Sequence, residues 1–314
     1  MKNIGSFPRT LLQAVKYFSD LDVCRGFLAH LRWPDGIMCP SCGSFDISDM
    51  PTRKLWRCKL CRRQFSVKVG TIFEDSALGL DKWLPAVWAL ASAKNGVSSY
   101  ELARSIGVTQ KSAWHMLHRI RLAMQTKGFA APLYGVIEVD ETFIGGKVRN
   151  KPLRKRTGNT GFWEKTAVMG VLQRGGDVRA FTIPEAKAAH LQAGVIKNVA
   201  EGSHVYSDGH MGYRPLEFAY EHRFVDHLLN EYVRGQVHVN GIENFWCLLK
   251  RSIKGTYIKP EPQHISRYVD EQVFRFNSRK LLDAERFSDV LAKVAGCRLT
   301  WRNLTGKSES PTER

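Results

Sequence analysis

The sequence predicts a multidomain α+β protein with a small cysteine-rich ribbon, a helical region and an α/β domain in which short strands alternate with helices. Three observations lead to this division: two closely spaced C-x2-C pairs, apolar residues at helical spacing over 80–127, and short apolar runs alternating with helical patterns from Tyr134 onward. A chain of 314 residues has room for two or three domains. The expected ranges are a helical lead-in at 1–35, the ribbon at 36–75, the helical region at 76–130, the α/β domain at 131–290 and a C-terminal tail at 291–314.

The charge balance is strongly basic, with 47 Lys and Arg against 30 Asp and Glu, a net charge of +17. Such a surplus favours a polyanionic partner such as DNA, because each cation that meets a phosphate releases condensed counterions. Charge alone leaves open a basic protein without a nucleic-acid role, or one that binds an acidic membrane surface. No run approaches ~18 apolar residues, so we expect no membrane span. The first twenty residues lack the apolar core of a signal peptide, so we expect a cytoplasmic protein.

Four of the seven cysteines form the pattern C-x2-C…x15…C-x2-C. Zinc takes four soft ligands in a tetrahedron, and two C-x2-C turns that each give two thiolates meet that need. Four reduced structural cysteines and a redox pair are weaker interpretations, since two matched pairs would then be coincidence. The expected structural zinc ligands are Cys39, Cys42, Cys58 and Cys61. The single cysteines, expected to be core residues, are Cys24, Cys247 and Cys297.

The second half of the ribbon is rich in cations and contains no acid between Arg53 and Lys68. Trp56 and Phe65 lie among these cations. This composition favours a ribbon that contacts DNA phosphates, although a structural ribbon with a solvated basic face is the alternative. The cations are Arg53, Lys54, Arg57, Lys59, Arg62, Arg63 and Lys68, of which we expect Arg57, Arg62 and Arg63 to contact DNA.

Residues 98–121 are predicted to form two helices joined by a short turn. Ser98 or Ser99 is expected to cap the first helix, Gly107 to end it and Thr109 to cap the second. A basic second helix after a glycine-bearing turn is typical of helix-turn-helix proteins, in which that helix enters the major groove. A plain helical linker is the alternative. The second-helix side chains expected to reach DNA are Lys111, His115 and Arg119.

Three acidic residues lie at the ends of predicted strands or near the start of a predicted helix. Asp140 ends the run GVIEVD, Asp208 ends SHVYSD, and Glu243 lies near the start of GIENFWCLLKR. Carboxylates at strand ends commonly build sites, and three that converge can hold two divalent metal ions, for which oxygen ligands favour Mg²⁺ or Mn²⁺. Each acid also has a structural interpretation: a turn former for either Asp, or a capping box in which Asn240 caps the helix and Glu243 stands at its third position.

Longer stretches around these acids resemble one family. VIEVDETFIGGK, VYSDGHMGY and VHVNGIENFWCLLKRSIKGTY are similar to the catalytic blocks of insertion-sequence transposases of the zinc-ribbon-bearing IS fifteen-ninety-five (ISXO-like) family. The segment CPSCGSFDISDMPTRKLWRCKLCRRQFSVKVGTIF resembles the N-terminal module of the same family. The order of ribbon, helical region and catalytic domain also matches, and the resemblance spans nearly the whole chain.

The resemblance implies a ribonuclease H-like α/β catalytic domain, with a mixed sheet flanked by helices, in which Asp140 and Asp208 are the first two metal-binding acids. Family members vary at the third position, some having Asn in place of the acid. We expect Glu243 there, because a carboxylate binds Mg²⁺ better than a neutral amide, with Asn240 as the alternate. Lys250, seven residues after Glu243 and on the same helical face, is expected to hold DNA phosphate near the metal. Strand alternation places Glu138 on the same face as Asp140, which makes it a reserve ligand. Arg251 is a further expected DNA contact. A basic loop beside the first acid is also expected to hold phosphates, with a solvated loop as the alternative; its cations are Lys147, Arg149, Lys151, Arg154, Lys155 and Arg156.

The function expected from this resemblance is metal-dependent phosphoryl transfer on DNA, in which strand cleavage frees a 3′-hydroxyl that then attacks target DNA. The partners would be element ends and target DNA in a bacterial, nucleoid-associated setting. The reaction joins two ends, so we expect a homodimer or higher multimer. A non-catalytic DNA-binding regulator and a nuclease that only hydrolyses are the rival interpretations. The regulator leaves the acids of the α/β domain unexplained.

Overall fold

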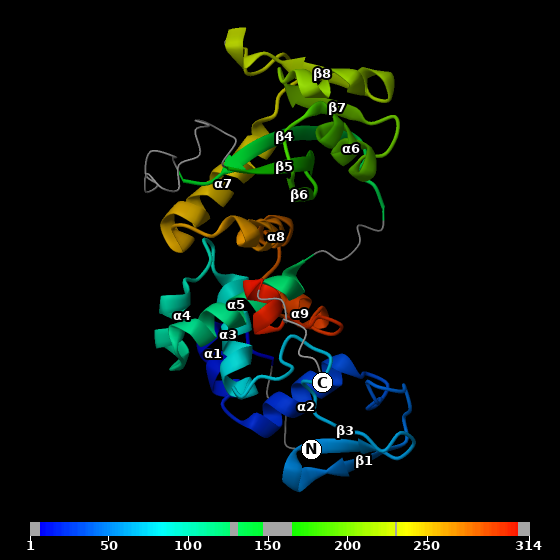
Figure 1. Cartoon of the computed structure of the whole chain (residues 1–314), viewed down its shortest axis with the longest axis vertical. Coiled ribbons are helices and arrows are strands. Elements are labelled where there is room, and N and C mark those ends of the chain that lie inside the picture. The colour runs from blue at the N-terminus through cyan, green and yellow to red at the C-terminus, as the bar shows by residue number, and fades with distance from the viewer. Residues whose placement is uncertain (1–6, 126–130, 147–164, 230, 307–314) are drawn as a thin grey trace, which may run out of the picture. The chain divides into compact units, whose positions relative to one another are not determined.

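The computed structural model describes residues 7–125, 131–146, 165–229 and 231–306. The chain divides into two compact units (Figure 1): the first comprises Met1–Met124 with Leu281–Arg314, and the second comprises Gln125–Lys280. Sequence patterns placed 281–290 in the α/β domain, whereas the structure places them in the first unit. The reason is that α9 (Asp283–Ala292) buries Phe287 and packs against α3 (Leu80–Ser92).

The first unit opens with two short helices and a three-stranded antiparallel sheet. Thr10 caps the first helix through a capping box with Gln13, and Asp20 caps the second through two backbone N–H groups. In the sheet, Trp56 and Phe65 are buried side by side, and Trp33 meets both rings edge-on. The elements are α1 (Leu11–Tyr17), α2 (Leu21–Arg32), β1 (Ile47–Met50), β2 (Leu55–Cys58) and β3 (Gln64–Phe65).

The helical part of this unit contains the predicted pair of helices, α4 (Ser99–Ile106) and α5 (Gln110–Met124). Ser98 caps α4 in a capping box with Glu101, and Gly107 ends it in the left-handed conformation at φ 63°. The Thr109 side chain accepts a hydrogen bond from Ser112 N at 3.2 Å and so caps α5. The two predicted helices, their caps and the turn between them are therefore confirmed.

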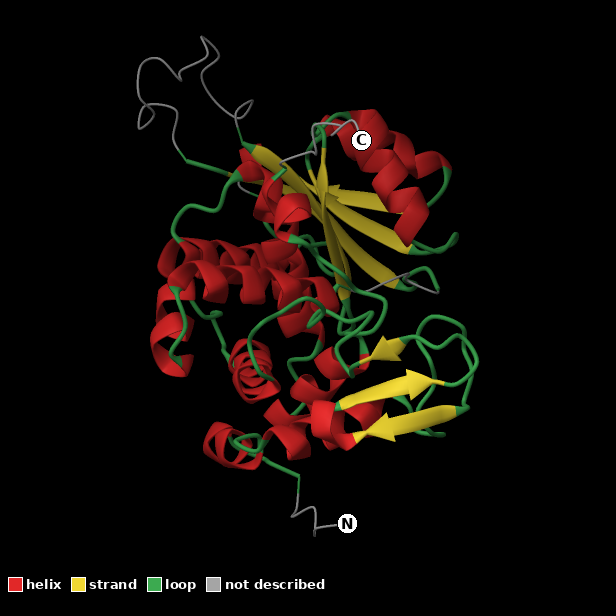
Figure 2. Cartoon of the chain, turned by 60° about the horizontal axis from the view of Figure 1, so that its bottom comes forward, coloured by secondary structure: helices red, strands yellow, loops and turns green. Residues whose placement is uncertain are grey.

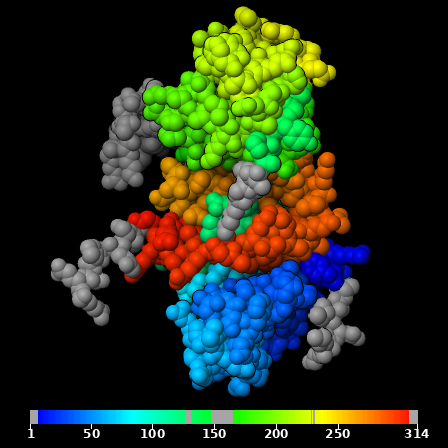
Figure 3. Space-filling view, turned by 90° about the vertical axis from the view of Figure 1, so that its right-hand side faces the viewer, coloured from blue at the N-terminus to red at the C-terminus, as the bar shows by residue number. Residues whose placement is uncertain are grey.

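The C-terminal residues of the chain complete the first unit. Figure 3 shows them in orange and red against the blue and cyan N-terminal part of the same unit. Beyond α9, the short helix α10 (Trp301–Thr305) places Trp301 edge-on to Trp114 and His115 of α5. The prediction of a C-terminal tail at 291–314 is therefore wrong for 291–306, which are part of a folded unit, while 307–314 lie outside the described residues.

The second unit is built on a five-stranded mixed sheet with the order β6-β5-β4-β7-β8. The first three strands are antiparallel neighbours, and β7 and β8 run parallel to β4. This is the ribonuclease H-like arrangement that the resemblance implied. The strands are β4 (Val136–Ile144), β5 (Thr166–Gln173), β6 (Val178–Ile183), β7 (His204–Asp208) and β8 (Glu221–Val225).

Helices cover both faces of this sheet (Figure 2). On one face α7 (Asn240–Ser252) and α8 (Ile265–Asn277) build a core with Leu172, Phe245 and Trp246. On the other face α6 (Ala188–Asn198) builds a core with Met169 and Tyr213. Strands β5 and β6 form an antiparallel hairpin, in whose turn Gly175 adopts φ 75°. Within the described residues, no helix has the length and apolar character needed to cross a membrane.

Candidate active site and zinc centre

The four paired cysteines converge in the ribbon. Their sulfur atoms lie within 4.8 Å of one another, with Cys39 Sγ 3.7 Å from Cys61 Sγ and Cys42 Sγ 3.5 Å from Cys58 Sγ. Four sulfurs at about 2.3 Å from one zinc ion stand about 3.8 Å apart along the edges of a tetrahedron. The backbone N–H of Cys61 donates to Cys58 Sγ at 3.4 Å, and this bond, with the neighbouring thiols, lowers the pKa of Cys58 to about 7. The cluster therefore fits the structural zinc ion of a ribbon.

The three single cysteines are not ligands of this cluster. Cys24 and Cys297 are buried, as predicted, and burial with the nearby Asp81 carboxylate raises the pKa of the Cys24 thiol to about 12. Cys247 differs from the prediction, since it is exposed on α7. The buried face of that helix is occupied by Phe245, Trp246 and Leu249, which leaves position 247 pointing to solvent.

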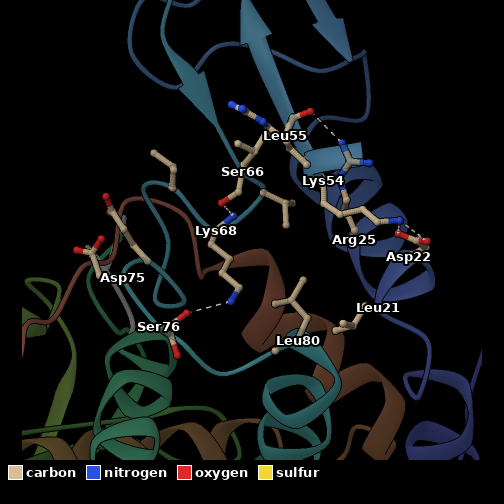
Figure 4. Close-up of a pocket in the computed structure, with 15 residues that line it drawn as sticks. Leu21, Asp22, Arg25, Lys54, Leu55, Ser66, Lys68, Asp75, Ser76 and Leu80 are labelled. Atoms are coloured by element: carbon tan, nitrogen blue, oxygen red, sulfur yellow. Dashed lines mark hydrogen bonds and ion pairs between the residues drawn. The ribbon is translucent and has the colours of Figure 1, made fainter. Parts of the chain in front are cut away.

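Several of the ribbon cations are engaged inside the first unit. Figure 4 shows the cavity beside the ribbon, where Lys68 Nζ donates to the Ser76 carbonyl and Lys54 pairs with Asp22. Lys59 pairs with Asp46 at 2.8 Å. The contacts of Lys68 and Lys54 join the ribbon to the helical part of the unit. The expected DNA-contacting cations Arg57, Arg62 and Arg63 are all exposed.

The predicted DNA contacts on α5 separate into two kinds. Lys111 is exposed, with its ammonium 4.7 Å from the centre of the Trp301 ring. Arg119 is buried and donates to the backbone carbonyls of Leu299 and Glu74, so its guanidinium is engaged within the protein. His115 is partly buried against Trp301, and burial lowers its pKa. The C-terminal segment therefore covers much of the helix face that was expected to meet DNA.

Sheet register brings two of the predicted acids together. Glu138 of β4 is level with Tyr206 of β7 in the parallel pair, so Asp140 and Asp208, two residues further on each strand, are neighbours. Strand β7 ends at Asp208, as predicted, whereas β4 continues to Ile144 alongside β5. The β4 edge next to the end of β7 is therefore left open, and one carboxylate oxygen each from Asp140, Glu141 and Asp208 lie within 4.8 Å of one another.

Two hydrogen bonds orient the Asp140 carboxylate, one of them from helix α7. Trp246 Nε1 donates to Asp140 Oδ2 at 2.9 Å, and the Glu141 backbone N–H donates to Asp140 Oδ1 at 2.8 Å. Gly170, opposite Asp140 on β5, makes room for the indole, since a Cβ there would lie 2.6 Å from Trp246 Cζ2. The absence of a side chain at Gly170 of β5 thus leaves the space in which Trp246 of α7 contacts Asp140 of β4.

Burial and mutual repulsion raise the pKa of two of the clustered acids, Asp140 and Glu141. Burial raises the pKa of Asp140 well above its ordinary value, and the Asp208 and Glu141 carboxylates raise it further. Burial likewise raises the pKa of Glu141, whose Oε2 accepts a hydrogen bond from Tyr213 at 2.8 Å. Clustered carboxylates that repel one another form a site where a divalent cation would be stabilised, and their oxygen donors suit Mg²⁺ or Mn²⁺.

A pocket adjoins these acids on the α6 face of the sheet. Glu141 belongs to both the acid cluster and the pocket, and His210 Nε2 lies 3.9 Å from Glu141 Oε1. The His210 backbone N–H also donates to Asp208 Oδ1 at 3.1 Å. The remaining lining residues are Phe143, Lys165, Ala167, Pro184, Glu185, Ala186 and Lys187.

The structure does not bring Glu243 into the acid cluster formed by the described residues. Glu243 lies in the first turn of α7 with its side chain 44% exposed, and its Oε1 is 3.9 Å from His227 Nε2. Trp246, one turn later, takes the position against Asp140. Asn240 is the first residue of α7 and is exposed; the helix N-cap is Val239 and has no side-chain cap. The capping-box alternative for Asn240 and Glu243 is therefore wrong.

The remaining predicted site residues are exposed, paired elsewhere or outside the described residues. Lys250 and Arg251 are exposed in the last turn of α7. Glu138, the reserve ligand, is buried and paired with Arg174, apart from the acid cluster. The predicted phosphate contacts Lys147, Arg149, Lys151, Arg154, Lys155 and Arg156 lie outside the described residues.

Three residues of this site were given no role by the sequence analysis: Glu141, Trp246 and Tyr213. Strand alternation assigns Glu141 to the face opposite Asp140, and the structure agrees, since Glu141 accepts from Tyr213 of one core while Asp140 accepts from Trp246 of the other. The available signal was its position directly after Asp140 at a predicted strand end. Trp246 was visible only as an apolar residue in a helical pattern, because its contact depends on Gly170 of another strand.

Comparison with known proteins gives two family matches. Residues 132–277 match the ISXO2-like transposase domain, and residues 20–64 match the transposase zinc-ribbon domain. A relative, described as an uncharacterized protein in transposable element ISH50 of Halobacterium salinarum, is 29% identical over 255 residues, covering 76% of this chain and 85% of the relative.

Two solved structures show weaker similarity. One is a simian T-cell lymphotropic virus intasome in complex with PP2A regulatory subunit B56 gamma, at 13% identity and a TM-score of 0.26, covering 58% of this chain and 66% of that one. The other is a pre-cleavage Mos1 transpososome, at 12% identity and a TM-score of 0.27, covering 67% and 78%. TM-scores at this level do not define a shared fold, so the assignment depends on the family matches.

Proposed function

Because the chain belongs to the ISXO2-like insertion-sequence transposases that carry an N-terminal zinc ribbon, we propose that it binds element ends and catalyses metal-dependent DNA strand cleavage and strand transfer. The observation that carries this proposal is the cluster of Asp140, Glu141 and Asp208 at the open sheet edge of the matched domain. A regulator that only binds DNA would not need three clustered carboxylates, whose burial and mutual repulsion raise the pKa of Asp140.

We assign Asp140 and Asp208 as ligands of divalent metal, Mg²⁺ or Mn²⁺, with two ions per site. The third ligand is Glu243, favoured because a carboxylate binds Mg²⁺ better than a neutral amide, or Glu141, which already lies in the cluster. Asn240 remains the alternate position on α7. When bound, the metal ions would supply charge neutralisation at the scissile phosphate. Trp246 would orient Asp140 through its indole N–H.

DNA binding is assigned to exposed cations of both units. On the ribbon these are Arg57, Arg62 and Arg63, and on α5 it is Lys111. At the end of α7, Lys250 and Arg251 are exposed and would hold phosphates. Arg119 is left out of this surface because its guanidinium is engaged by backbone carbonyls. A homodimer or higher multimer is proposed because two element ends must be joined.

The test is cleavage and joining of labelled duplexes that carry the ends of the encoding element, in the presence of Mg²⁺ or Mn²⁺. Asp208→Ala is expected to abolish both products while gel-shift binding is retained. Glu221→Ala, which removes an exposed carboxylate of β8, is the matched control and is expected to cleave normally.

The same assay assigns the third ligand and separates the rival functions. Loss of activity in Glu243→Ala with activity retained in Glu141→Ala assigns the ligand to α7, and the reverse assigns it to β4. Binding without any metal-dependent strand breakage would refute the enzyme and favour a DNA-binding regulator. Cleavage without joined product would indicate a nuclease that only hydrolyses.

A further inference from the structure

The second unit contains a buried ion pair that the proposed chemistry does not use. Glu138 is 1% exposed, and Arg174 Nε donates to its Oε1 at 2.9 Å. Arg174 follows β5, and its side chain is 27% exposed. Glu138 lies two residues before Asp140 on β4, yet it is separate from the acid cluster. A buried charge that is not at a reacting centre needs another reason to be there.

Glu138 makes a second contact, to the start of α7. Its Oε2 accepts a hydrogen bond from the backbone N–H of Ile242 at 3.0 Å. Ile242 is in the first turn of α7, where backbone N–H groups have no acceptor in the preceding turn. The helix has no side-chain cap of its own, so a carboxylate from the sheet takes the place of an N-cap and also meets the positive end of the helix dipole.

The packing around this contact is close. A Cβ on Gly241 would lie 2.7 Å from Glu138 Oε2 and 2.6 Å from Leu172 Cδ2. Glycine at position 241 therefore allows the first turn of α7 to approach the sheet closely enough for the hydrogen bond. The carboxylate has little room to move aside, because Arg174 holds its other oxygen.

Arg174 extends the connection to the segment that enters α7. Its Nη1 donates to the Gln236 carbonyl at 3.0 Å, and its Nη2 donates to the His238 carbonyl at 3.0 Å. His238 Nδ1 lies 3.6 Å from Glu138 Oε1 and 3.2 Å from Arg174 Nη2. One guanidinium thus joins the β4 carboxylate to two carbonyls of the segment that precedes the helix.

We propose that Glu138 is a positioning residue, which together with Arg174 anchors the first turn of α7 to β4 and so sets Trp246 against Asp140. Asp140 and Glu138 share a strand, and Trp246 and Ile242 share a helix, so the anchor and the active-site hydrogen bond connect the same two elements. The consequence for catalysis depends on the proposed transposase function, but the anchoring itself does not.

The primary test measures amide hydrogen exchange in the full-length protein and needs no DNA. Glu138→Ala removes the acceptor, and exchange of the Ile242 amide is expected to accelerate by about tenfold or more, since hydrogen bonds to charged groups are among the stronger ones. Exchange in α6 serves as the internal reference and is expected to change little. Glu138→Gln keeps an oxygen acceptor and is expected to exchange more slowly than Glu138→Ala.

A second readout separates a positioning residue from a metal ligand. Mn²⁺ binding, followed by electron paramagnetic resonance, is expected to stay within about threefold of wild type in Glu138→Gln, whereas Asp208→Ala is expected to lose it. Under the proposed function, the DNA cleavage rate falls in Glu138→Ala and is largely restored in Glu138→Gln. Gly241→Ala, which crowds the same oxygen, is expected to accelerate Ile242 exchange as Glu138→Ala does.

Two results would overturn the proposal. The first is unchanged Ile242 exchange in Glu138→Ala, or in Glu138→Gln and Gly241→Ala together if the alanine variant does not fold. The second is loss of Mn²⁺ binding in Glu138→Gln, which would make Glu138 a metal ligand. A wild-type protein that fails to cleave DNA but shows the expected exchange pattern would refute the transposase function and leave the anchor standing.

Discussion

Trp246 donates its indole N–H to the Asp140 carboxylate at 2.9 Å, so a helix residue that follows the sheet in the chain orients an acid on the central strand. The contact depends on Gly170 of β5, which leaves space for the ring. Orientation of a metal-binding carboxylate by an outer hydrogen bond is a common means of tuning such sites. The same contact explains why an indole is present at a position where any large apolar residue would fill the core.

Trp246→Phe is therefore expected to reduce DNA cleavage by about tenfold, because a hydrogen bond to a charged acceptor contributes about 1.5–3 kcal/mol while phenylalanine keeps most of the apolar packing. The measurement is the single-turnover cleavage rate. Trp88→Phe is the matched control, since Trp88 Nε1 has no hydrogen-bond partner within the described part of the chain. A Trp246→Phe variant that cleaves at the wild-type rate would show that the hydrogen bond does not orient Asp140.

The raised pKa of Asp140 predicts how the stability of the metal-free protein depends on pH. A carboxyl that keeps its proton to higher pH in the folded than in the unfolded state favours folding at low pH, and this contribution is lost as pH rises from about 3.9 through the raised folded value. Asp140→Asn is expected to flatten that decline. The measurement is Tm against pH with a chelator present.

Adding Mn²⁺ at pH 7 is expected to raise the Tm of wild type and to have a smaller effect on Asp140→Asn, because a cation offsets the repulsion among the three carboxylates. The exposed-site variant Glu221→Ala controls for a general effect of charge removal. Equal pH slopes in wild type and Asp140→Asn would contradict the electrostatic account of the cluster.

The zinc centre gives a prediction with a control inside the same protein. Cys58→Ser is expected to lose bound zinc and to unfold the ribbon, because β1 to β3 enclose only a few buried side chains, chiefly Trp56 and Phe65. Cys247→Ser removes an exposed thiol of α7 and is expected to keep one zinc ion per chain. Metal analysis together with tryptophan fluorescence measures both effects. Full zinc content in Cys58→Ser would argue against the four-cysteine site.

Local signals in the sequence predicted most of the elements. The Cys pairs located the ribbon, Ser98 and Gly107 located α4, and apolar runs located strands of the five-stranded sheet. Each of these depends on spacing within a short stretch of chain. The position of Asp208 at a strand end was predicted for the same reason.

Features that depend on distant residues were not predictable in this way. Asp140 was expected to end its strand, but pairing with β5 extends β4 to Ile144. Arg119 was expected on a DNA-facing surface, but the segment that follows the second unit in the chain covers it with the Leu299 carbonyl. Glu138 was considered a reserve ligand, and only the approach of α7 gives it a different partner. Helix periodicity and strand alternation identify a face, not the element that will cover it.

The last prediction concerns DNA binding by the exposed arginines of the ribbon. Replacing Arg57, Arg62 and Arg63 together with alanine is expected to weaken DNA binding and to lower the slope of log K against log salt by about 0.9 for each phosphate that the protein no longer neutralises. Lys54, Lys59 and Lys68 are excluded from this set because carboxylates or backbone carbonyls already engage them. Lys16→Ala, which removes an exposed cation on α1, is the matched control and is expected to leave the slope unchanged. The measurement is fluorescence anisotropy of labelled duplex DNA over a salt series. If the triple variant keeps the wild-type slope, the ribbon does not bind phosphates and its role is to support the helices with which it packs.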